Sequence, residues 1–228
     1  MKKIGFIGVF DKTDLILSIS RILVKAGKKV LVVDATTNQK CKYVVPVINP
    51  TKSYITEFEE IDVAVGFENL ENIKQYLGIE KEGQMEYDFI MIDTDNYESV
   101  IRYSLQSSDN LYYVTSFDAY SLKKGIELLS ELNIPLHMTR LFYSKEMLKE
   151  EIEYFDYLAL GLKVEWNENQ LFFLLENGDN AAIIENQRLA KIKLKNLSNE
   201  YRENVIYLVN DIDKQIGEKQ IRTIIKNL

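Results

Sequence analysis

The chain has few of the residues that covalent cross-links and metal sites require. Its 228 residues include one cysteine, Cys41, and one histidine, His137. A single cysteine excludes an intrachain disulfide, and a single histidine argues against a zinc site. We therefore expect Cys41 to be a buried or loop thiol without chemistry and His137 to be an ordinary strand residue.

Flexible linkers and long apolar runs are also lacking. Three prolines and ten glycines leave little room for a linker, and no low-complexity tract or internal repeat is present. No apolar run approaches the ~20 residues of a membrane-spanning helix. The charged sequence DKTD at 11–14 interrupts the first apolar run too early for a signal peptide. We expect one domain covering residues 1–228 of a cytoplasmic protein.

Positive charge is in deficit. The chain has 28 Lys and Arg against 35 Asp and Glu, a net charge of −7, and its pI is near 5.0. Broad binding to nucleic acid depends on a basic face that neutralises phosphates. We therefore do not expect this protein to contact nucleic acid broadly.

What the sequence does contain is a regular alternation of short apolar runs with amphipathic segments. Strands are predicted over Lys3–Val9, Lys29–Asp34, Tyr87–Asp93, Asn110–Phe117 and Pro135–Tyr143. Helices are predicted over 15–26, 98–106 and 121–132, and through the last 30 residues. Strands that are apolar throughout and alternate with helices indicate an α/β fold, a mainly parallel twisted sheet with helices on both faces.

Two regions give a mixed pattern. Cys41–Tyr54 predicts a short strand that Pro46 and Pro50 interrupt. Between residues 150 and 180, the sequence LKVEWNENQLFFLL predicts a hairpin that turns at WNENQ.

Polar residues follow the ends of several predicted strands. They are Gly8–Thr13, Asp34, Asp93 with Thr94, and Thr115–Asp118. Ligands of parallel sheets bind beyond the carboxyl ends of the strands. The sequence therefore predicts a ligand site at this edge of the sheet.

Three segments in this order resemble the deviant P-loop ATPases of the ParA/MinD family, which position plasmids, division sites, pili and other cargo. They are AGKKVLVVDA at 26–35, YDFIMIDTDNYESV at 87–100 and SSDNLYYVTSFDAYSLKKGIELL at 107–129. The resemblance covers residues 2–142 well and the C-terminal third loosely. It implies the three-layer P-loop NTPase fold, ATP and magnesium as cofactors, and a homodimer that nucleotide bridges.

Several site residues of the family have counterparts here. The family loop reads Lys-Gly-Gly-x-Gly-Lys-Thr, and Lys12 matches its invariant lysine, Gly8 its first glycine and Thr13 its magnesium-binding hydroxyl. Asp34 and Asp93 match the aspartates that follow the second strand and the Walker B strand. The resemblance implies nucleotide contacts at Gly8, Asp11, Lys12, Thr13, Asp34, Asp93, Thr115 and Asp118, with Mg²⁺ held by Thr13, Asp34 and Asp93.

Other family positions have changed. Ile7 stands in place of the signature lysine, and Val9 and Asp11 stand in place of glycines. Thr36 replaces the second aspartate of the family's Asp-x-Asp, and Asp95–Asn96 replaces Pro-Pro. These changes make the loop a degenerate Walker A motif.

Asp11 is the most consequential of these changes. A carboxylate about 5 Å from a phosphate costs roughly 3 kcal/mol per phosphate charge at an effective dielectric constant of about 20. Asp11 also has the character of a helix N-cap, and Asp14 follows at capping-box spacing. We expect Asp11 to act as an internal anion that binds the N–H groups a phosphate would bind.

The sequence therefore supports two functions of different classes. The first is a pseudo-ATPase of the TadZ type, a localisation or assembly factor for partition, pilus or secretion machinery with weak or no hydrolysis. The second is a working switch that dimerises around Mg-ATP. A third class, a phosphoacceptor receiver domain, would also place aspartates at strand ends. Such domains are much shorter than this chain, which argues against this class.

Two further segments suggest partner surfaces. Ile221, Ile224, Ile225 and Leu228 form an apolar stripe beside Lys219, Arg222 and Lys226. This pattern is typical of a basic amphipathic helix on an anionic membrane, and equally of a last helix packed on its own domain. The sequence EYFDY at 153–157 fits either a partner surface or half-buried structure.

Overall fold

The chain is organised around one eight-stranded sheet. The computed structural model describes residues 1–48, 50–80, 82–144 and 149–228. The strand order is β3-β4-β2-β5-β1-β6-β7-β8, and every neighbouring pair is parallel except β3–β4. This arrangement confirms the predicted α/β class with a mainly parallel sheet.

The strands are β1 Lys2–Ile7, β2 Val30–Asp34, β3 Tyr54–Phe58, β4 Ile61–Val65, β5 Phe89–Thr94, β6 Asn110–Ser116, β7 Leu136–Ser144 and β8 Val164–Leu174. The α-helices are α1 Thr13–Lys25, α2 Cys41–Val44, α3 Leu70–Tyr76, α4 Tyr97–Arg102, α5 Ala119–Leu132, α6 Lys149–Leu158, α7 Asn177–Leu189, α8 Asn199–Ile212 and α9 Glu218–Asn227. A 3₁₀ turn spans Leu105–Ser107.

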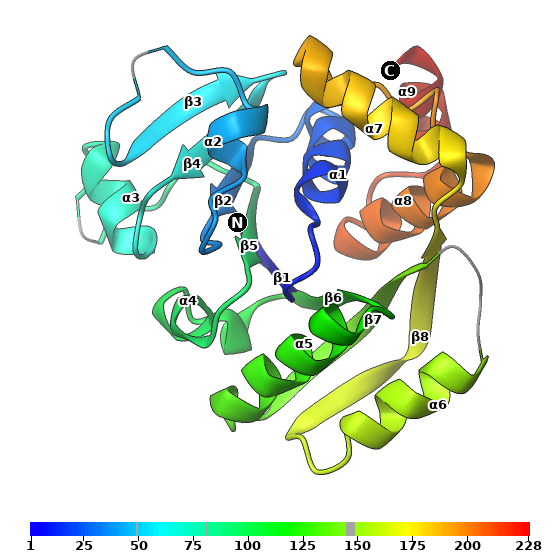
Figure 1. The fold of residues 1–228 in the computed structure, drawn as a ribbon. Helices are drawn as coiled ribbons and strands as arrows, with labels where there is room; N and C mark the ends of the chain where they lie inside the picture. Colours follow the sequence, from blue (N-terminus) through cyan, green and yellow to red (C-terminus); the bar gives the residue numbers. More distant parts are fainter. Residues whose placement is uncertain (49, 81, 145–148) are drawn as a thin grey trace.

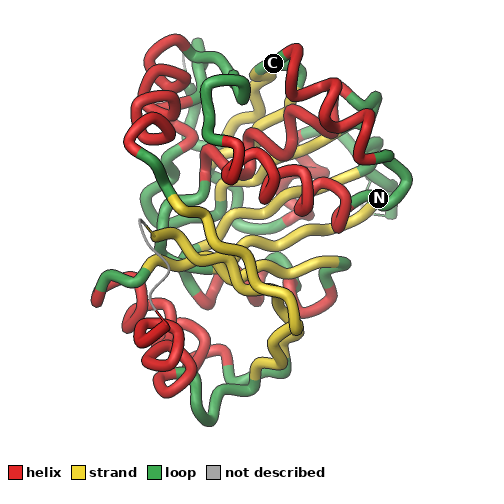
Figure 2. Tube along the Cα trace, turned by 90° about the vertical axis from the view of Figure 1, so that its right-hand side faces the viewer, coloured by secondary structure: helices red, strands yellow, loops and turns green. Residues whose placement is uncertain are grey.

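Helices cover both faces of the sheet (Figure 1). One core contains buried residues of α1, α7, α8 and α9, and the other contains buried residues of α3, α4, α5 and α6. Figure 2 shows the strands as a twisted layer with helices above and below it. The three layers predicted from the sequence are therefore present.

The alternation of side chains between the two faces explains the continuous apolar runs. In β5, Met91 lies in the core with α1, while Ile90 and Ile92 lie in the core with α4 and α5. Both faces of such a strand are buried, so the positions of β5 before Asp93 are all apolar. The five predicted strands are confirmed, with ends that differ by one or two residues.

The two mixed regions were predicted wrongly. Between Cys41 and Ser53 the described residues contain the short helix α2 and no strand; Asn49 lies outside the described residues. The predicted hairpin is instead one long strand, β8, parallel to β7. Residues 167–169 bulge opposite Thr139, between the pairs Met138↔Trp166 and Arg140↔Gln170. A polar bulge has the composition of a turn, which explains the error.

An unpredicted hairpin joins β3 to β4. Its turn residues Glu59 and Glu60 both have positive φ, 52° and 65°. That conformation is costly for residues other than glycine and asparagine. Arg21 of α1 binds the carbonyl oxygen and carboxylate of Glu59, and Lys25 lies 2.7 Å from the Glu60 carboxylate. Ion pairs from α1 therefore hold this turn.

Candidate functional site: the loop between β1 and α1

Three strand ends meet at the start of α1. The loop 8–12 leaves β1, Asp34 ends β2, and Asp93 lies next to the end of β5. In the sheet register Asp93 lies opposite both Phe6 of β1 and Asp34 of β2. The fold therefore brings together the loop and both aspartates, as the sequence predicted.

Gly8 is a position that only glycine can occupy. Its φ is +142°, and a Cβ atom there would overlap the carbonyl oxygen of Val114 on β6. Its N–H donates to the carbonyl of Thr94 at 3.0 Å. The loop is consequently pinned between β5 and β6 where it leaves the sheet.

Lys12 is turned into the protein. Its side chain is 2% exposed, and its ammonium lies 2.6 Å from Oδ1 of Asp93. The same nitrogen donates to the carbonyl oxygen of Gly8 at 2.7 Å. Burial and the nearby charge of Asp34 raise the pKa of Asp93, and the charge of Lys12 lowers it. The resulting pKa is about 6. The pair is therefore a buried, closely spaced ion pair.

Asp34 organises the segment after β2. Its Oδ1 accepts from the N–H of Thr36 at 3.1 Å and from the Thr36 hydroxyl at 2.6 Å, and its Oδ2 accepts from the N–H of Cys41 at 2.8 Å. Burial, together with the charges of Asp34 and Asp93, raises the pKa of the Cys41 thiol. Cys41 is thus a buried, protonated thiol that starts α2.

Asp11 precedes the N-cap residue of α1, lines the pocket described below and forms an ion pair with Lys40. Its Oδ1 accepts from the N–H of Thr13 at 3.2 Å. Burial raises the pKa of Asp11, but the hydrogen bond and charge of Lys40 and the Thr13 N–H outweigh it and hold the pKa below its usual value. Asp11 is therefore an ionised carboxylate.

The capping box predicted for this helix start is wrong. Lys12 occupies the N-cap position, and Asp11 precedes it. The carboxylate of Asp14 faces Lys40 at 3.4 Å and accepts from the side-chain amide of Gln187 on α7 at 2.7 Å. Because Lys40 and Gln187 bind its carboxylate, Asp14 does not accept a hydrogen bond from the loop backbone as a capping box requires.

These groups surround a pocket of about 330 Å³. It is lined by Val9, Phe10, Asp11, Lys12, Thr13, Thr36, Asn38, Lys40, Tyr43, Asp93 and Asp95. Thr13 is buried at its edge. Lys40 is a cation of the pocket that was not predicted from the sequence. Its position in the loop after β2, at the carboxyl edge of the sheet, is the one sequence feature that could have indicated it. Nothing in the sequence indicates Gln187, which is 173 residues from Asp14.

Thr115 and Asp118 do not line this pocket. Thr115 is buried at the end of β6, and its hydroxyl donates to the carbonyl of Ser116. Asp118 is the N-cap of α5, where its carboxylate accepts from the N–H of Ser121 at 2.9 Å. In this structure both residues bind their own strand end and helix start.

The residues of the pocket, as they lie, fit Mg-ATP poorly. The ammonium of Lys12 is bound to Asp93 and Gly8, and the Thr13 N–H is bound to Asp11. Both carboxylate oxygens of Asp34 accept hydrogen bonds from its own loop. In the described part of the chain, no cluster of three or more Asp, Glu, His or Cys side chains is arranged to hold a metal ion.

The apolar stripe of the last helix, α9, faces the protein. Ile221 and Ile225 are buried, and Ile224 and Leu228 pack against the same core. The structure therefore has the packed arrangement, one of the two alternatives left by the sequence. Within the described residues, no helix combines the length and apolar character needed to cross a bilayer.

No protein-family model and no curated protein sequence matches the chain. Several solved structures match it over nearly its whole length. A putative plasmid partition protein from Borrelia burgdorferi B31, bound to AMPPNP, has a TM-score of 0.60 at 16% identity and covers 95% of this chain and 100% of its own. The septum site-determining protein MinD from Pyrococcus horikoshii OT3, complexed with Mg-ADP, has a TM-score of 0.59 at 17% identity and covers 95% and 97%.

The MinC:MinD cell division protein complex from Aquifex aeolicus also matches, with a TM-score of 0.53 at 12% identity and coverage of 100% and 95%. Identities this low show a shared fold and nothing finer. The predicted ParA/MinD-like P-loop NTPase fold is therefore confirmed.

Proposed function

We propose that this chain is a localisation or assembly factor on the ParA/MinD-like fold, with a phosphate loop closed by its own ion pairs and no efficient nucleotide hydrolysis. The observation that carries the proposal is the position of Lys12. Its ammonium is buried between Asp93 and the carbonyl of Gly8 instead of pointing into the pocket. The cation that would bind a phosphate is already neutralised within the protein.

Opening the loop for a phosphate is costly on this account. Moving Lys12 outward leaves Asp93 buried without its cation, and breaking such a pair costs about 3–5 kcal/mol. Repulsion between a phosphate and the Asp11 carboxylate also costs roughly 3 kcal/mol per phosphate charge, at a separation of about 5 Å and an effective dielectric constant of about 20. Lys40, which is paired with Asp11 and faces Asp14, offsets part of this repulsion.

The changed positions also supply no charge for hydrolysis. Ile7, in place of the family's signature lysine, is buried in the core with α4 and α5. Thr36, in place of the second aspartate, donates its hydroxyl to Asp34. Neither side chain contributes a charge near a transferred phosphoryl group, where such catalysis is largely electrostatic.

The proposed role works through protein partners. The solved structures that share the fold include a plasmid partition protein and a MinD bound to MinC. The second of these structures holds the shared fold in a complex with another protein. We infer that this chain also acts through protein contacts, in a positioning or assembly machine.

The competing function is the Mg-ATP switch, and one observation favours it. Lys12, Thr13 and Asp93 line one pocket, and Asp34 lies beside Asp93 in the sheet. Two of the matching structures hold AMPPNP and Mg-ADP. In this function, Lys12 moves from Asp93 to the phosphates when nucleotide enters.

Calorimetric titration with Mg-ATP separates the two functions. The wild type, Asp11→Gly and Lys12→Ala are compared, with Lys123→Ala, an exposed lysine of α5, as the control. We expect no binding by the wild type or the control and a gain of binding in Asp11→Gly. Micromolar binding by the wild type and the control that Lys12→Ala abolishes would establish the switch instead.

A further inference from the structure

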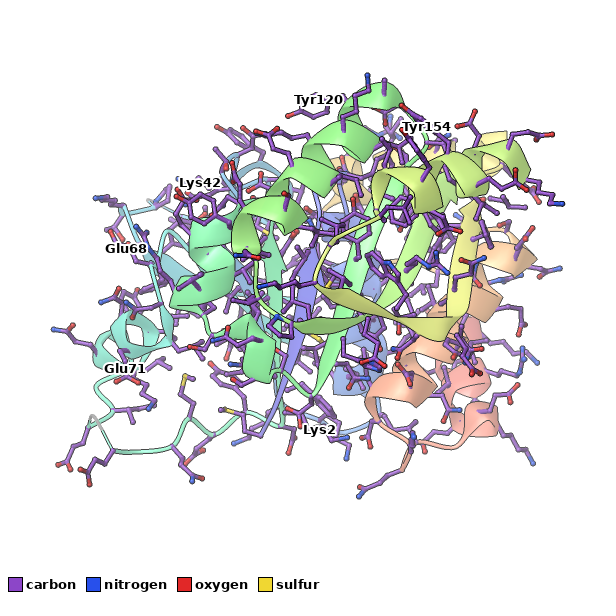
Figure 3. The ribbon with its side chains drawn as sticks, turned by 90° about the horizontal axis from the view of Figure 1, so that it is seen from below. Lys2, Lys42, Glu68, Glu71, Tyr120 and Tyr154 are labelled. Carbon is purple, nitrogen blue, oxygen red and sulfur yellow. The ribbon has the colours of Figure 1, made fainter. Side chains whose placement is uncertain are left out.

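Helix α6 presents an acidic, aromatic side to solvent. Glu150, Glu153, Tyr154 and Tyr157 are spaced at i, i+3, i+4 and i+7, so they lie on one side of the helix, which we term the acidic face. All four are exposed, Tyr157 at 68%, while Phe155 on the opposite side is buried. Figure 3 shows Tyr154 on the outer surface of α6. Tyrosines in such a position are typical of protein interfaces.

A complementary surface lies at the end of α7. Residues 186–198 contain four cations, Arg188, Lys191, Lys193 and Lys195, and no Asp or Glu. Ile192 and Leu194 between them are buried, Lys191 and Lys195 are exposed, and Lys193 is half-buried. We term the four cations, with exposed Ile184 one turn before Arg188 on α7, the basic face. Among the described residues, no carboxylate forms an ion pair with any of these four cations.

The two faces lie on opposite sides of the sheet. Phe155 anchors α6 in the core that contains α4 and α5, whereas Ile192 and Leu194 belong to the core that contains α1 and α8. In Figure 1, α6 and α7 accordingly lie on opposite sides of the strands. The acidic face therefore cannot reach the basic face of its own chain, but it can reach that of a second copy.

We propose that copies of this chain associate head to tail, with the acidic face of one copy on the basic face of the next. The carboxylates of Glu150 and Glu153 meet lysine and arginine side chains of opposite charge, and Glu153 exchanges its exposed partner on α6, Lys149 at 3.7 Å, for one of them. The tyrosine rings pack against Ile184 and accept cations over their faces. Two different faces join in such a contact, so each copy keeps one free face and the assembly extends by addition of further copies until a ring closes.

A second copy suits the basic face better than a nucleic acid does. No aromatic residue occurs between Phe173 and Tyr201, so the segment that carries the four cations supplies no ring on which a base could stack. The net charge of −7 also opposes a long polyanion. The acidic face offers both the carboxylates and the rings that the basic face lacks.

Sedimentation velocity over a wide range of protein concentration, at low and high salt and without nucleotide, tests the proposal. Variant A is Arg188→Gln/Lys191→Gln/Lys195→Gln, and variant B is Glu150→Gln/Glu153→Gln. The matched control, Lys123→Gln/Lys163→Gln/Lys214→Gln, removes the same charge from exposed lysines of three other segments. We expect concentration-dependent growth for wild type and control, weakened by salt, and at least about tenfold weaker self-association for A and for B.

An equal mixture of A and B gives the decisive result. Variant A keeps the acidic face and variant B keeps the basic face, so the mixture should form a dimer that does not grow further. A wild type that stays monomeric, or a mixture that stays monomeric, would overturn the proposal. So would binding of wild type to duplex DNA or anionic vesicles that only variant A loses, without self-association. The phosphate loop takes no part, so the outcome is independent of ATP binding.

Discussion

The buried pair of Lys12 and Asp93 makes a quantitative prediction about stability. Lys12→Met keeps most of the lysine stem and removes its charge, and Asp93→Asn is nearly isosteric with the carboxylate. Each single variant leaves one buried ion without its partner. The double variant removes both ions together. A double-mutant cycle therefore measures whether the ammonium is inside the protein in solution.

The magnitude follows from the burial of the pair. Even with Lys12 beside it, the pKa of Asp93 rises from its usual 3.8 to about 6, which corresponds to roughly 3 kcal/mol. Removal of one partner of a buried pair costs about 3–5 kcal/mol. In a chain of this length this lowers the melting temperature by roughly 6–20 °C, at about 2–4 °C per kcal/mol. The double variant should be no less stable than the worse single variant, a coupling of about 3 kcal/mol or more.

The pH dependence supplies a second signature. The folded pKa of Asp93 lies above its unfolded value, so its contribution to stability is full below pH 3.8 and is lost as pH rises to about 6. Lys12→Met removes the charge that lowers this pKa, so the loss should extend above pH 6. Asp93→Asn should abolish this component.

Urea unfolding of the four proteins at a series of pH values measures both effects, with Lys123→Met as the control for loss of a lysine. Effects of Lys12→Met and Asp93→Asn that add within about 0.5 kcal/mol would refute the reasoning. Lys12 would then be a solvated lysine at neutral pH, and the closed loop would not exist in solution.

Three further predictions concern the elements that hold this site. Gly8→Ala should cost about 3 kcal/mol or more by chemical unfolding, since its Cβ overlaps the Val114 carbonyl, whereas Gly178→Ala, where nothing lies within 4 Å, should cost nothing. Ile221→Ala should lower the unfolding free energy by about 2–5 kcal/mol, and an unchanged stability would show that α9 is undocked. Arg21→Met should cost about 2–3 kcal/mol and expose the β3–β4 turn to protease; an unchanged cleavage rate would contradict the clamp.

The elements of the fold that could be predicted are those with a clear local sequence pattern. Strands such as β1 and β5 are buried on both faces and read as continuous apolar runs, so they were found. The β3–β4 hairpin was missed because its turn residues, Glu59 and Glu60, carry no glycine or asparagine signal. Their conformation is held by Arg21, which is 38 residues away from Glu59.

The sequence identified only some residues of the site, since it missed Lys40 and included Thr115 and Asp118, which do not line the pocket. The positions of Gly8, Asp34 and Asp93 at strand ends follow from the parallel sheet. The inward direction of the Lys12 side chain could not be predicted, because the sequence is equally consistent with a lysine in solvent and a lysine bound to phosphate. The network that runs from Asp11 through Lys40 and Asp14 to Gln187 joins distant segments, and only the fold shows it.

The central claim is that the ammonium of Lys12 stays with Asp93 even when nucleotide is offered. The most direct measurement is a crystal structure of the wild type grown with excess magnesium and AMPPNP. We predict the Lys12 nitrogen still within hydrogen-bond distance of Asp93 and Gly8, with no nucleotide in the pocket. AMPPNP bound in the pocket, with Lys12 turned onto its phosphates, would contradict the account and establish a nucleotide switch.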